Sequence, residues 1–189
     1  MPEAAFSLLA GWDSFYVITG SSAAALTGLM FVVVALSGEA RLTSGPEASV
    51  ATIRAFSTPT VVHFGAVLLL AALLTTPGHT VLTLSGSVGA CGFAGLCFIR
   101  WVMVQMRRQT AYAPIAADWE WHVRWPALAY TCLLGGAAGL WWRPATALVV
   151  VAAAALFLLY IGIHNAWDAA IYVSVARRGA EQPGGGHGA

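Results

Sequence analysis

The chain of 189 residues is 59% hydrophobic and 9% charged, with a formal net charge of +1 at pH 7. Because a soluble domain carries about 25% charged residues, this composition argues against a soluble protein and indicates a surface that faces lipid. The near-zero net charge offers no basic face for nucleic acid, and the lack of lysine argues against lysine Schiff-base chemistry.

The first apolar stretch, residues 15–36, contains no charged side chain. At about 1.5 Å per residue, it is long enough to cross a hydrocarbon core of about 30 Å. Four similar stretches follow, so we expect an all-α, multi-pass bundle of five membrane-spanning helices. The expected spans are residues 15–36, 55–76, 80–100, 125–142 and 145–175, and residues 177–189 are expected to form a disordered tail.

Three local features refine this expectation. Pro59 should fall in the first turns of the second span, where proline costs least. The third helix should continue past its span through residue 109. Residues 110–125 are then expected to form a linker, in which the DWEWH sequence of residues 118–122 is interpreted as an interfacial anchor.

The arginines give the expected orientation. With five spans, eight arginines lie on one side and only Arg143 lies on the other; the eight are Arg41, Arg54, Arg100, Arg107, Arg108, Arg124, Arg177 and Arg178. The positive-inside rule then predicts an N-terminus outside and a C-terminus in the cytoplasm, with the protein integral to the cell (inner) membrane.

Small residues recur at helical spacing in three of the spans. Such stripes let helix backbones approach closely, either within one chain or between copies in a homo-oligomer. Both interpretations stay open at this point. The stripes are Gly20, Ala24 and Gly28 in the first span, Gly89, Gly92 and Gly95 in the third, and Gly135 and Gly139 in the fourth.

Polar side chains inside a span are costly, so they mark the candidate site. They gather near the expected cytoplasmic ends of the second and fifth spans. His164 and Asp168 lie four residues apart and therefore share a helix face. The candidate binding residues are Thr60 and His63 in the second span, and Tyr160, His164, Asn165 and Asp168 in the fifth.

Three interpretations of these residues remain open. Asp168 could pair with Arg54 or Arg100 as an interfacial cap. The two spans could enclose a polar cavity for an ion, a proton or a small polar solute. His63 and His164 could instead ligate a b-type haem, although their expected depths differ by several ångströms.

The sequence contains no nucleotide-binding loop, nucleophile elbow or zincin motif, and the three cysteines are expected to be free thiols. An enzyme is therefore not the favoured interpretation, and no catalytic residue is assigned. The leading prediction is a small homo-oligomeric channel or transport-type protein with a site near the cytoplasmic face. The alternatives are a non-catalytic scaffold subunit of a membrane complex and a haem-binding electron-transfer subunit.

Overall fold

The computed structural model describes residues 9–41, 47–108 and 115–181, with side chains described for residues 9–35, 58–108, 115–171 and 174. Every element in these ranges is a helix, which confirms the all-α expectation. The helices are α2 (Asp13–Arg41), α3 (Glu47–Thr75), α4 (Val81–Arg108), α5 (Ala116–Trp119), the π-helical η1 (Glu120–Arg124), α6 (Trp125–Gly139) and α7 (Pro144–Glu181).

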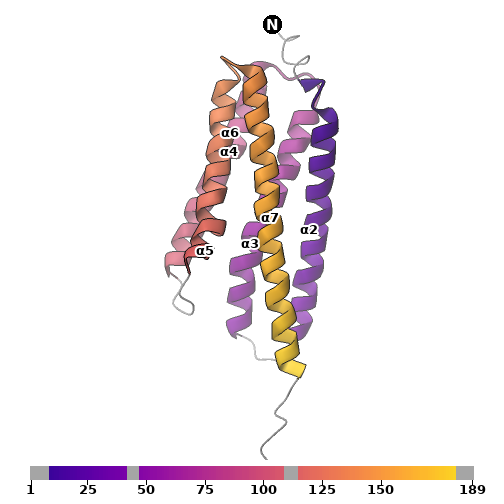
Figure 1. Cartoon of the computed structure of the whole chain (residues 1–189), viewed down its shortest axis with the longest axis vertical. Coiled ribbons are helices and arrows are strands. Elements are labelled where there is room, and N and C mark those ends of the chain that lie inside the picture. Colours follow the sequence, from indigo (N-terminus) through magenta and orange to yellow (C-terminus); the bar gives the residue numbers. More distant parts are fainter. Residues whose placement is uncertain (1–8, 42–46, 109–114, 182–189) are drawn as a thin grey trace, which may run out of the picture.

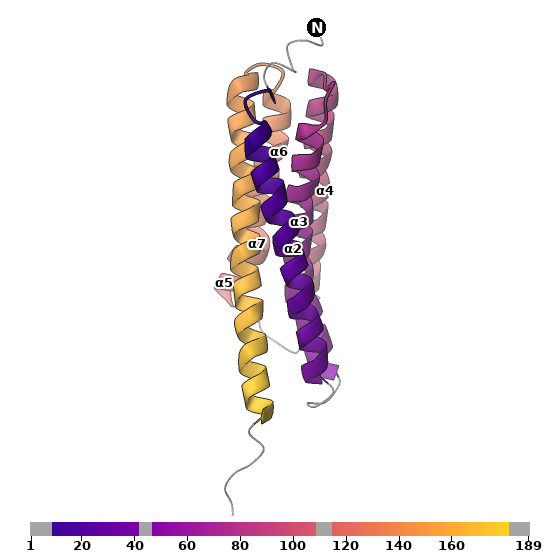
Figure 2. The same cartoon turned by 90° about the vertical axis from the view of Figure 1, so that its right-hand side faces the viewer.

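The long helices form an up-and-down bundle in which each of α2, α3, α4, α6 and α7 runs opposite to the long helix before it (Figure 1). The first residue of α2 and the last of α7 therefore lie at opposite ends of the bundle. The central helix α7 contacts α2, α3 and α6, while α4 packs mainly against α6. Figure 2 shows how the long helices lie nearly parallel to the bundle axis.

Within the described residues, four helices contain a segment that is long and apolar enough to cross a membrane, which indicates a membrane protein. Many large apolar side chains on their outer faces are exposed, as expected for a surface that meets lipid. The four segments are Asp13–Ala35, Thr58–Thr75, Val81–Arg108 and Pro144–Ile171. The fourth expected span, residues 125–142, coincides with α6, whose 15 residues reach only about 22 Å by themselves.

Two expectations about helix ends are wrong. Helix α3 begins at Glu47, so Pro59 lies well inside it and is buried rather than in the first turns. Polar residues such as those preceding Ala55 do not stop a helix, and membrane helices tolerate an interior proline when neighbours satisfy the freed carbonyl. Helix α7 runs to Glu181, so residues 177–181 of the expected disordered tail are helical. Residues 182–189 lie outside the described ranges.

The described part of the expected linker, residues 115–125, is also mostly helical, and residues 110–114 lie outside the described ranges. Helix α5 starts at Ala116 and passes through η1 into α6 without a break. A π-helical turn widens the helix by one residue and changes which side chains face inward. As a result His122 is only 6% exposed, whereas an interfacial anchor would place it at the surface.

Several glycines serve close packing within this chain. A Cβ at Gly95 would overlap the ring of Tyr130, and one at Gly92 would press on the backbone of α6 at 3.0 Å. On α2, a Cβ at Gly20 would lie 2.8 Å from the Cβ of Ala71. The within-chain interpretation is therefore confirmed at these positions. A Cβ at Gly28 or Gly135 would meet open space, so these two play no such role.

Candidate functional site

The candidate residues separate into two groups, because adjacent positions on α7 point in different directions. Asn165 continues the buried stripe of Leu158 and Ile161 and is 2% exposed. Tyr160, His164 and Asp168 lie on a different, partly exposed face of the same helix. We call the two groups the inner cluster (Thr60, His63, His122, Tyr130 and Asn165) and the rim cluster (Trp121, Tyr160, His164 and Asp168).

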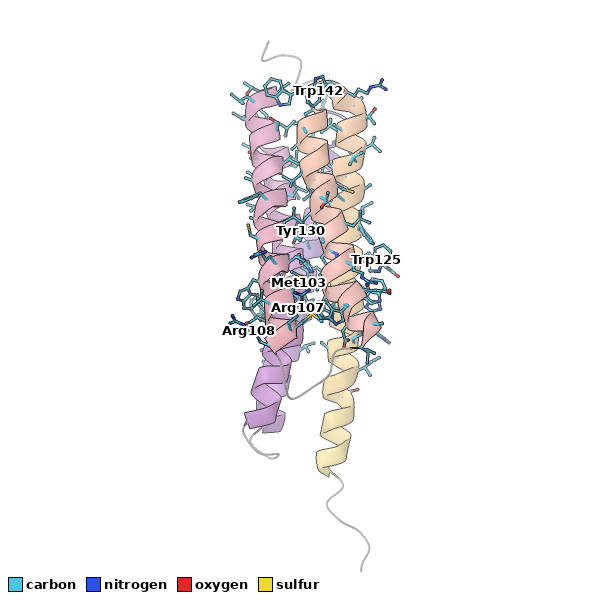
Figure 3. The ribbon with its side chains drawn as sticks, turned by 90° about the vertical axis from the view of Figure 1, so that its left-hand side faces the viewer. Met103, Arg107, Arg108, Trp125, Tyr130 and Trp142 are labelled. Carbon is cyan, nitrogen blue, oxygen red and sulfur yellow. The ribbon has the colours of Figure 1, made fainter. Side chains whose placement is uncertain are left out.

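His63 and Tyr130 form the centre of the inner cluster. Both side chains are completely buried, and His63 Nδ1 lies 3.0 Å from the Tyr130 hydroxyl. This hydrogen bond joins α3 to α6, and Figure 3 shows Tyr130 at mid-height in the bundle. The His63 ring also meets the edge of Phe98 from α4, with ring centroids 6.3 Å apart. The second nitrogen, Nε2, is buried and has no hydrogen-bond partner among the described residues.

Asn165 reaches the same level of the bundle from α7. Gly162, about one helical turn before Asn165, lies against the ring of Phe64, which follows His63 in α3. Helices α3 and α7 therefore meet closely beside His63. Both side-chain polar atoms of Asn165, Oδ1 and Nδ2, are buried without a hydrogen-bond partner within the described part of the chain. A buried amide left in this state costs about 1–3 kcal/mol. The residue therefore offers a donor and an acceptor to a small polar occupant.

His122 connects the inner cluster to the rim cluster. Its Nδ1–H donates to the Asp118 carbonyl at 3.1 Å, which holds the ring in place. His122 also interacts electrostatically with both His63 and His164.

The rim cluster lies at the edge of the bundle. The His164 ring stacks on Trp121 with centroids 3.7 Å apart and planes 8° from parallel. Its Nδ1 lies 3.5 Å from Asp168 Oδ2, within range of an ion pair but outside hydrogen-bond geometry. Asp168 is 60% exposed in its side chain, so the carboxylate is open to its surroundings. Tyr160 is 56% exposed and touches Trp121 rather than the inner cluster.

The structure thus brings together only part of the predicted site. Thr60, His63 and Asn165 are all buried, with His63 packed against α4 and α6, whereas Tyr160, His164 and Asp168 are at least partly exposed. The described side chains pair Asp168 with His164 and show no ion pair with Arg100; the Arg54 side chain lies outside the described residues.

His122, Tyr130 and Trp121 were missed by sequence reasoning. The only available signals were the polar residues within the tryptophan-rich DWEWH sequence and the tyrosine inside the fourth span. Neither signal predicts burial, because the π-helical turn before α6 decides which way His122 faces.

The site gives no strong support to a metal or haem. No three His, Cys, Asp or Glu side chains of the described residues converge to hold an ion. His63 and His164 each lie against a different aromatic ring, and no described contact joins them. The haem interpretation therefore stays an untested prediction.

The chain matches no protein-family model, no curated protein and no solved structure. Its fold and site are therefore interpreted from its own residues.

Proposed function

We propose that this chain is a transport-type membrane protein whose inner cluster accepts a proton from the cytoplasmic side and passes it through the bundle. The observation that carries the proposal is a group of buried polar side chains from three helices, with unpaired polar atoms on His63 and Asn165. Buried polar groups in membrane helices mark ion pathways and proton relays.

The chemistry of the two clusters favours a proton over other cargo. Imidazole and carboxylate side chains can each accept and release a proton, and four of them form a series from the rim cluster to the inner cluster: Asp168, His164, His122 and His63. No arginine is described within hydrogen-bond or ion-pair distance of these groups, which disfavours an anion.

The other half of the bundle constrains the mechanism. Beyond the inner cluster the described core is mainly apolar and includes Leu70, Leu74, Leu148 and Val151, with Tyr16 and Thr19 as its buried polar side chains. The proposal is therefore a gated path that opens through rearrangement of the helices rather than a permanently open pore.

The proposal includes a five-span topology with the N-terminus outside and the C-terminus in the cytoplasm of the inner membrane. Helices α5, η1 and α6 contain 4, 5 and 15 residues, and together they cover about 36 Å, enough for the fourth crossing. Figure 3 shows Arg107 and Arg108 in the half of the bundle away from Trp142, which supports the proposed positive-inside orientation. A homo-oligomer is part of the same proposal.

Proton flux into liposomes loaded with a pH-sensitive dye tests this function. We expect the wild-type protein to collapse an imposed pH gradient faster than protein-free liposomes, and Asn165→Leu to reduce the rate at least tenfold. Asp168→Asn should reduce it less, because Asp168 lies at the rim. His79→Gln is the control, since His79 lies in the α3–α4 turn, where it bonds to Leu73 rather than to either cluster.

A rate that survives both Asn165→Leu and Asp168→Asn would refute the proposal, as would a wild-type rate equal to that of empty liposomes. In the second case, stable co-purification with a fixed partner would favour the scaffold function instead.

A further inference from the structure

A second feature lies at the other end of the bundle, in a groove between α6 and α7. The groove has a volume of about 330 Å³ and an almost wholly apolar lining. Gly135 and Gly139 form its α6 side, Thr146 and Val150 form its α7 side, and Trp142 and Arg143 stand at its open end. None of these residues belongs to the inner or rim cluster.

The groove exists because of the small residues at this helix contact. A Cβ at Gly136 would lie 2.6 Å from Val151 Cγ2, so the two helices touch there. Beside that contact, a Cβ at Gly135 would meet no atom within 4 Å. The missing side chain leaves an indentation that runs along the bundle surface toward the α6–α7 turn.

The turn fixes a positive charge at the mouth of the groove. The backbone N–H of Arg143 donates to the Gly139 carbonyl at 2.8 Å, and its carbonyl accepts from Ala147. The Arg143 side chain is exposed, and no described acidic side chain pairs with it. Trp141 and Trp142 are 55% and 77% exposed, as expected for aromatic residues at the level of lipid headgroups.

We propose that this groove binds an anionic phospholipid of the adjacent leaflet. One acyl chain would lie in the apolar indentation, and the phosphate would meet the Arg143 guanidinium. The volume is at the lower end of the range of about 300–1,000 Å³ for ligand pockets, which suits a chain segment better than a helix about 10 Å wide.

The charge also argues against a second copy of the chain as the occupant. A twofold contact would use the same patch on both subunits and would bring two Arg143 side chains near each other. An anionic headgroup neutralises that charge, whereas a second copy doubles it.

Native mass spectrometry of the purified protein with phosphatidylglycerol or phosphatidylcholine tests the proposal. We expect the wild type to retain phosphatidylglycerol preferentially. Arg143→Gln should reduce that preference about fivefold, as expected for one basic residue near an anionic headgroup. Gly135→Leu should fill the groove and reduce retention of both lipids.

Gly86→Leu is the matched control for Gly135→Leu. A Cβ at Gly86 also meets open space, and Gly86 lies five residues from the same end of the bundle on α4, away from the groove. Thr146→Leu fills the groove from the α7 side and serves if Gly135→Leu fails to fold.

Equal lipid retention by Gly135→Leu and Gly86→Leu would overturn the proposal. Loss of a dimer in Gly135→Leu without a change in lipid retention would also overturn it, because the occupant would then be a second copy. If Arg143→Gln retains phosphatidylglycerol as well as the wild type does, the proposed contact between Arg143 and the phosphate is wrong, and so is the assignment of an anionic headgroup.

Discussion

Substitution of Gly95 by alanine tests the packing that holds the inner cluster. A Cβ at Gly95 would overlap Cγ, Cδ1 and Cε1 of Tyr130. The ring cannot move aside easily, because Tyr130 is completely buried and its hydroxyl bonds to His63. Overpacking of this kind costs about 1–3 kcal/mol, and the better helix propensity of alanine offsets about 1 kcal/mol. We therefore expect Gly95→Ala to lower the free energy of unfolding by about 1 kcal/mol, and by at most about 2 kcal/mol.

Gly86→Ala on the same helix is the matched control. A Cβ there meets open space, so the substitution should be neutral or should raise the free energy of unfolding by up to about 1 kcal/mol. Unfolding by sodium dodecyl sulfate in mixed micelles, followed by circular dichroism, measures both variants.

A double-mutant cycle makes the Gly95 test specific. If the cost arises from the tyrosine ring, Gly95→Ala should cost almost nothing in a Tyr130→Ala background. The same loss in both backgrounds would refute the reasoning, and so would equal stability of Gly95→Ala and Gly86→Ala in the wild-type background.

Three further predictions use simpler comparisons. Tyr130→Phe leaves His63 Nδ1 unpaired and should lower the free energy of unfolding by about 1–3 kcal/mol in the same assay, whereas Tyr160→Phe at the exposed rim should change it by less than about 0.5 kcal/mol. Because His122 is only 6% exposed, protonating its ring would place a charge inside the packed bundle, so the free energy of unfolding should fall as the pH drops below about 6.5. Unfolding of the wild type and of His122→Gln across about pH 5–8 should show a smaller acid loss in the variant; identical profiles would contradict this. Cysteines introduced at the two chain ends should react with an impermeant thiol reagent on opposite sides of the membrane, and labelling on the same side would reject five spans.

The sequence predicted the long helices well because a membrane imposes a simple physical requirement. An uncharged stretch such as residues 15–36 must satisfy its backbone polar groups internally, and a helix does so without partners. The ends of those helices were harder to predict. Nothing in the hydrocarbon requirement stops α3 at the membrane surface, so the helix extends back to Glu47 through polar residues that have no strong helix breaker among them.

The candidate site was predicted only in part because periodicity identifies faces but not their neighbours. Tyr160, His164 and Asp168 share a stripe, as their spacing of four residues indicates, yet that stripe meets Trp121 at the bundle edge. Asn165, one position further along α7, turns toward α3 because successive helical residues differ by about 100°. Which of these two faces of α7 becomes buried depends on how the neighbouring helices pack, and the residue spacing along α7 alone does not reveal that packing.

A purely structural role and a transport role make different demands on Asn165. In a scaffold, an amide with two unpaired buried atoms contributes nothing, and leucine of similar volume should raise the free energy of unfolding by about 1–3 kcal/mol. In a transport protein the same substitution should also stabilise the bundle, but it should abolish proton flux. A site that must bind and release its cargo keeps polar groups that lower stability. Measuring both quantities on one variant separates the roles. Gain of stability with unchanged flux would mean that Asn165 has no part in transport, while loss of stability would mean that the amide already has a structural partner, such as an ordered water.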